Sequence, residues 1–104
     1  MAWIRIIGRD LKDKDRLERA AAALGLGVEP GEGPPGLIVI DLDREGVPSD
    51  LPAGVTAVGY YSHIDAEIAA QAEAAGIAAI RRGMFWTDLP EILGPVADED
   101  AEES

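Results

Sequence analysis

The feature that most constrains the fold is a continuous apolar run ending in acid, LIVIDLD, over residues 37–43. A run this apolar, with no polar alternation, is typical of a central parallel strand that is covered on both faces. Parallel strands need long crossover connections, which are usually helices, so strands and helices should alternate along the chain. The run therefore predicts an α/β domain built on a parallel sheet.

A strand and a helix are predicted before this run. Residues 2–8 are apolar and rich in isoleucine, as in a buried first strand. The next segment has helical periodicity, with Asp10 or Asp13 able to cap its start and Gly25 able to end it. Its apolar positions are Leu17, Ala20, Ala21 and Leu24.

Two connections contain the proline and glycine that break regular structure. Residues 27–36 predict a loop, and the sequence leaves open a very short edge strand at Val28. Residues 44–54 predict a second loop, short for a parallel crossover. The later elements are a strand over 55–60 and a helix from a capping box at 62–65 to Gly76. A last short strand, from 77 to 81 or 82, then leads through residues 84–86 to a helix capped by Thr87 or Asp88.

Length and charge limit the organisation and the partners. The 104 residues suffice for one domain over residues 1–96, and residues 97–104, which hold five acids, predict a disordered tail. The net charge of −11 disfavours direct nucleic-acid binding, which depends on cationic side chains. Cysteine is absent, and no apolar run is long enough to cross a membrane, so we expect a cytoplasmic protein.

Three segments resemble the receiver domain of response regulators, a bacterial-type signal-transduction module. They are the first strand and helix, the LIVIDLD run, and the stretch from residue 62 to residue 93, and they cover about two-thirds of the chain. The resemblance implies a flavodoxin-like, three-layer α/β/α fold with a small parallel sheet of four or five strands in the order 2-1-3-4-5. It also implies that one helix and most of another are trimmed to loops.

A receiver holds Mg²⁺ with two acids after its first strand and accepts phosphate on an aspartate after its third. In this chain Arg9 stands in the acid pair, and Asp10 follows one residue later. Asp41 matches the phosphoacceptor. The receiver's hydroxyl position falls near Ser62, with Tyr61 as the other choice, and its lysine position falls on Arg82 or the next residue. One of the four positions is intact.

The missing acid carries a physical consequence. Transfer of phosphate to a carboxylate needs a metal to neutralise oxygen charge, and an arginine beside Asp41 would repel that metal. We therefore expect Arg9 or Arg82 to pair with Asp41, which implies a non-catalytic module that works without phosphate, metal or cofactor. Asp41 as a true phosphoacceptor, or as an ordinary strand end, and a binder of a small anion or nucleotide at the strand ends remain alternatives.

The aromatic residues and the histidine need separate interpretation. The residues Tyr60, Tyr61, Met84, Phe85 and Trp86 cluster near the last strand, where they either pack internally or form an exposed site for a protein partner or a second copy. Ser62, His63 and Asp65 lie too close together along one helix start to act as a catalytic triad, and they predict a helix cap.

Overall fold

The computed structural model describes residues 2–29, 31, 33–62 and 66–102. Its centre is a five-stranded, all-parallel sheet in the order β2-β1-β3-β4-β5, which is the order of flavodoxin-like folds. The strands are β1 (Trp3–Ile7), β2 (Gly27–Val28), β3 (Leu37–Asp41), β4 (Ala57–Tyr61) and β5 (Ile77–Arg81). The predicted α/β class is confirmed, and the short edge strand at Val28 that the sequence left open is present as β2.

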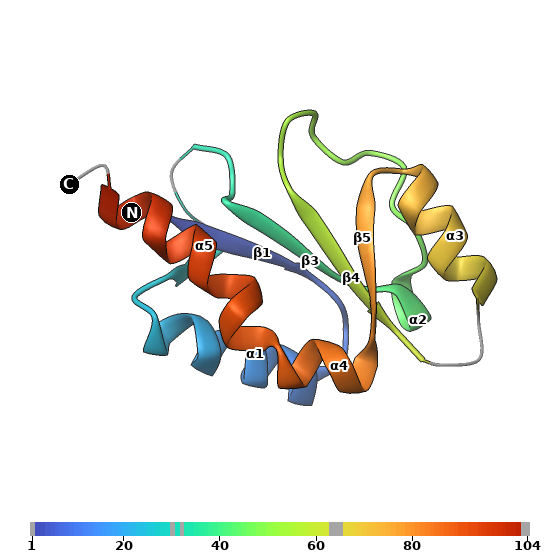
Figure 1. Cartoon of the computed structure of the whole chain (residues 1–104), viewed down its shortest axis with the longest axis horizontal. Helices are drawn as coiled ribbons and strands as arrows, with labels where there is room; N and C mark the ends of the chain where they lie inside the picture. The colour runs from blue at the N-terminus through green and yellow to red at the C-terminus, as the bar shows by residue number, and fades with distance from the viewer. Residues whose placement is uncertain (1, 30, 32, 63–65, 103–104) are drawn as a thin grey trace.

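Helices cover both faces of the sheet and complete three layers. Figure 1 shows α1, α4 and α5 on one side of the sheet and α2 and α3 on the other. The helices are α1 (Leu11–Ala23), α2 (Leu42–Glu45), α3 (Ala66–Ala74), α4 (Arg82–Thr87) and α5 (Leu89–Glu102).

The core has two parts because strand side chains alternate between the two faces. On the α1 side, Val39 and Val58 pack with Leu17, Phe85 and Leu93. On the α3 side the core is formed by Ile38, Ile40, Leu42, Ala57, Ala72 and Ile77. All five residues of β3 are buried, as expected for a central strand covered on both faces.

The start and end of α1 lie where the sequence predicts them. The Asp10 carboxylate accepts hydrogen bonds from the N–H groups of Lys12 and Asp13, so Asp10 is the N-cap. Gly25, at φ 76°, follows the last turn in the left-handed conformation that ends helices. Asp13 was the other candidate for the cap, and its side chain is buried instead.

The strand predicted over residues 37–43 ends at Asp41. Asp41 is the N-cap of the one-turn helix α2, and its carboxylate accepts from the N–H of Arg44. Leu42 then turns into the core against Gly59, where an added Cβ would lie only 2.6 Å from the Leu42 side chain. The capping aspartate and the glycine therefore allow a helical turn to replace the last two residues of the predicted strand.

Two predictions about the C-terminal part need correction. Residues 84–86 lie in a helix of their own, α4, which follows β5 directly and ends at Thr87, with Asp88 as its C-cap, before α5 begins. The segment 97–104 was predicted to be disordered, but α5 is helical to Glu102. Its alanines and glutamates are good helix formers, and extending a formed helix needs no new nucleus.

The predicted capping box and the predicted lack of a membrane-spanning segment remain to be compared with the structure. Residues 63–65 of the predicted capping box, including His63, lie outside the described residues. None of the helices in the described part of the chain has both the length and the apolar character needed to span a bilayer.

Candidate functional site

The candidate site lies at the carboxyl ends of β1, β3, β4 and β5, and Asp41 is at its centre. The Asp41 side chain is 0% exposed. One oxygen, Oδ1, accepts from the Arg44 N–H at 3.3 Å. The other, Oδ2, lies 3.6 Å from Arg44 Nε and 3.7 Å from Arg82 Nη2, and it accepts no hydrogen bond from the residues that the structure describes. Desolvation raises the pKa of Asp41, and the Arg44 N–H and the Arg82 charge oppose this rise.

Arg82 joins Asp41 to a second buried carboxylate. Its Nη1 donates to Oδ2 of Asp13 at 2.8 Å, and the guanidinium carbon lies 4.8 Å from the centre of the Tyr60 ring. Burial acts to lower the pKa of Arg82, but the hydrogen bond and charge of Asp13 and the charge of Asp41 raise it overall. One partly exposed guanidinium therefore lies beside two buried carboxylates.

Tyr60 completes this inner network. Its hydroxyl donates to Asp13 Oδ2 at 3.3 Å, and its ring packs against Phe85 with centroids 4.8 Å apart. Desolvation, together with the neighbouring charges of Asp41 and Asp13, raises the pKa of Tyr60 well above its usual value. The tyrosine therefore stays protonated and acts as a hydrogen-bond donor. We call Asp13, Asp41, Tyr60 and Arg82 the inner network.

A second set of charges lies outside the inner network, nearer to solvent. Arg9 Nε donates to Glu45 at 2.8 Å, and Arg9 Nη2 donates to the Arg44 carbonyl at 3.1 Å. Arg44 Nη2 lies 3.1 Å from Asp10 Oδ2. The hydrogen bond from the Asp13 N–H is the main reason that the pKa of Asp10 is lowered. We call Arg9, Asp10, Arg44 and Glu45 the outer network.

Ser62 faces a different acid from the one expected. Its N–H lies 2.9 and 2.8 Å from the two carboxylate oxygens of Asp43, and its hydroxyl donates to Oδ2 of Asp43 at 2.7 Å. This arrangement ties the end of β4 to α2. The Ser62 hydroxyl is thus held by Asp43, and no hydrogen bond joins it to Asp41 among the described residues.

The structure brings together part of the set named from the sequence. Arg82 lies beside Asp41, whereas Arg9 binds Glu45 and Asp10 caps α1. The sequence reasoning missed Asp13 as the main partner of Arg82. One signal was available: Asp13 precedes Leu17 and Ala21 at intervals of four, so it belongs to the buried stripe of α1.

The donor set does not fit the divalent cation that a receiver binds. The described residues contain no group of three or more histidine, cysteine, aspartate or glutamate side chains placed to hold a metal ion. Asp10, Asp13 and Asp41 each already lie beside a guanidinium group. A cation entering here would have to displace Arg82 or Arg44.

No family model, curated protein or solved structure matches this chain. The function of the site is therefore inferred from its geometry.

The five residues proposed as a partner surface divide into core and surface. Tyr60 and Phe85 are fully buried, so their interpretation as exposed contact residues is wrong. Trp86 is partly buried, with the Arg16 guanidinium 4.0 Å from its ring centre. Tyr61 is also partly buried, and only Met84, at 58% exposure, is open to solvent.

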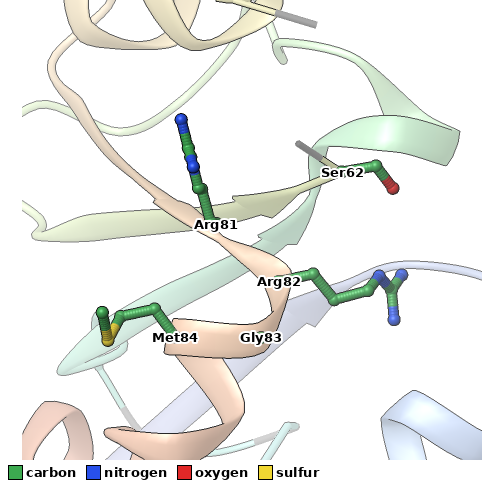
Figure 2. A pocket seen from close by; sticks show the side chains of 5 residues that line it. All are labelled: Ser62, Arg81, Arg82, Gly83 and Met84. Carbon is green, nitrogen blue, oxygen red and sulfur yellow. The ribbon is translucent and has the colours of Figure 1, made fainter. Parts of the chain in front are cut away.

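A surface pocket of about 490 Å³ lies at the carboxyl ends of β4 and β5. Its lining residues are Ser62, Arg81, Arg82, Gly83 and Met84. Figure 2 shows the Arg81 and Arg82 side chains diverging from adjacent positions, with Met84 on the far side of the α4 turn from Ser62. Arg82 is used in the inner network, while Arg81 forms no ion pair within the described part of the chain.

Proposed function

We propose that this chain is a non-catalytic, receiver-like interaction module that works without phosphorylation. One observation supports the proposal above the others: the only side chain that matches a phosphoacceptor, Asp41, is fully buried beneath the guanidinium groups of Arg82 and Arg44. In this proposal, these two arginine side chains take the place of the metal that a receiver binds beside its phosphoacceptor.

Electrostatics supports a fixed state. Desolvation favours the neutral form of Asp41, and the adjacent cations partly restore the charged form, so neither state draws in a further cation. A carboxylate that is to attack phosphorus must reach a phosphodonor, and phosphoryl transfer depends on metal ions that neutralise the developing charge. Asp41 has no solvent access, and Asp10 and Asp13 each already lie beside an arginine.

The partner in this proposal is a protein, and its contact surface lies around α4. Met84 is exposed there, and Trp86 is half-covered by Arg16. Exposed methionine beside aromatic and arginine side chains is a composition enriched in protein interfaces. Arg81 and Arg82 add positive charge to this end of a protein whose net charge is −11.

Treatment with a small acyl phosphate and Mg²⁺, followed by intact-mass measurement, tests the proposal. We expect no adduct, whereas a competent receiver treated in parallel should gain about 80 Da, the mass of one phosphoryl group. An adduct of this mass localised to Asp41 would support the phosphoacceptor function instead. The Asp41→Asn variant is the control for phosphorylation at other residues.

The pocket favours a second candidate function, the binding of a small anion at the strand ends. Arg81 provides an exposed cation there, next to the backbone of Gly83. Titration with inorganic phosphate and with a nucleotide, observed by amide NMR, tests this function. Saturable shifts near residues 81–84 that disappear in Arg81→Gln would support it, and shifts unaffected by this substitution would contradict it.

A further inference from the structure

We infer that a second copy of this chain docks along the outer edge of β5, so that two β5 strands pair antiparallel across a twofold axis. The inference goes beyond the proposed function, since it names a second copy as the partner and a surface other than the one around α4. It rests on a different observation, the contrast between the two edges of the sheet.

The two edges differ in how they are protected against pairing. At one edge, β2 has only two residues, and Pro34 and Pro35 follow within the same connection. Short strands and nearby prolines are common ways of blocking an edge. At the other edge, β5 has five residues, IAAIR, without proline or glycine and with a charge only at its last position. No other strand pairs with its outer side in the described part of the chain.

The side chains of β5 are small enough for close pairing and are incompletely covered. Ile77 belongs to the core on the α3 side, so Ala79 and Arg81 share that face by alternation. Ala78 is exposed on the other face, beside the half-buried Ile80. Pairing would cover Ala78 and Ile80, which the helices on that face leave partly exposed.

A twofold axis at Ala79 gives a self-complementary register. Ala78 would lie opposite the partner's Ile80, so each copy covers the exposed alanine of the other with an isoleucine. Arg81 would lie opposite the partner's Ile77, and the outward N–H and C=O groups of both strands would form ladder hydrogen bonds. A twofold contact needs one surface that complements itself, and this strand meets that condition.

Charge complementarity supports the same arrangement. Glu73 lies at the end of α3, four residues before Ile77, and its side chain is exposed. Because an antiparallel pair exchanges the strand ends, Arg81 of one copy approaches Glu73 of the other on the same face. Neither side chain forms an ion pair within the residues that the structure describes, so both charges are available to the partner.

Sedimentation velocity over a concentration series tests the inference. We expect a monomer–dimer equilibrium with Kd between about 1 μM and 1 mM. Ala78→Lys and Arg81→Glu should each raise Kd at least about tenfold. Adding Glu73→Arg to Arg81→Glu should restore most of the affinity, because the pair is reversed. Adding Glu67→Arg instead is the matched control and should not, since Glu67 lies at the other end of α3.

Hydrogen exchange of the β5 amides gives a readout that does not depend on variants. The outward amides of residues 77–81 should exchange more slowly at high protein concentration than at low. A monomer at about 1 mM, or a dimer that Ala78→Lys and Arg81→Glu leave unchanged, would overturn the inference. Neither result would change the expectation that Asp41 is not phosphorylated. The proposed function and the proposed dimer can therefore be refuted independently.

Discussion

The inner and outer networks are made of the same kinds of charge, at the same end of the sheet, yet they differ in access to water. In the inner network Asp41 is 0% exposed and Arg82 is shared with Asp13. In the outer network the Arg9 side chain is 77% exposed. Buried charges that lose their partner are strongly destabilising, whereas exposed pairs contribute little. The comparison teaches that burial, more than the number of ion pairs, decides which arginine the fold depends on.

The largest effect is expected at Arg82. Arg82→Gln leaves two buried carboxylates without their cation and should lower the free energy of unfolding by about 3 kcal/mol, measured by urea denaturation. Arg19→Gln, at an arginine on α1 whose side chain is 81% exposed, is the control and should change it by less than about 0.5 kcal/mol. Equal losses in the two variants would remove the distinction between the networks.

A smaller effect is expected at Asp10, which belongs to the outer network but also caps α1. Asp10→Ala removes the acceptor for the N–H groups of Lys12 and Asp13 and should cost about 1 kcal/mol in thermal or urea unfolding. Asp10→Asn keeps an acceptor oxygen and should cost less. If Asn and Ala cost the same, the ion pair with Arg44 contributes more than the cap.

Asp41→Asn should change how the free energy of unfolding depends on pH, because it removes the buried titratable group of the inner network. The pKa of Asp41 is raised in the folded state, so its contribution to stability is complete below the unfolded value near 3.8 and is lost as the pH rises through the folded pKa. Relative to the unmodified protein, Asp41→Asn should therefore become more stable between acid and neutral pH. Urea denaturation at both pH values measures this, and a relative loss of stability at neutral pH would show that the ion pairs outweigh desolvation.

The smallest effect is expected at Arg9. Arg9→Gln removes an exposed contact with Glu45 and should change the free energy of unfolding by less than about 0.5 kcal/mol. The residual contact should weaken further in high salt. A loss as large as that of Arg82→Gln would mean that the outer network supports the fold as much as the inner one.

The sequence predicts the fold better than the site. The fold depends on patterns within short segments, whereas the site depends on contacts between residues far apart along the chain. The apolar run over residues 37–41, the Asp10 cap and Gly25 are local patterns, and each lies where it was expected. The bond from Arg82 to Asp13 joins residues 69 positions apart, and the choice between Arg9 and Arg82 as the partner of Asp41 depends on how α4 leaves β5.

Local sequence patterns also did not predict which of the aromatic residues are buried. Tyr60 and Phe85 are core residues because α4 folds back over the end of β4, and the sequence predicts no helix over residues 84–86. Without α4, the sequence could not decide between internal packing and an exposed site for these two residues. A short helix without a side-chain cap gives little signal in the sequence.

Magnesium titration followed by amide NMR tests the central claim most directly, because the claim is that arginine side chains already fill the place of a metal beside Asp41. With Mg²⁺ raised to millimolar concentrations, the amides of residues 10–13, 41–44 and 82 should show only small, non-saturating shifts. A saturable change centred on Asp41 would show that a cation binds there and would contradict the account.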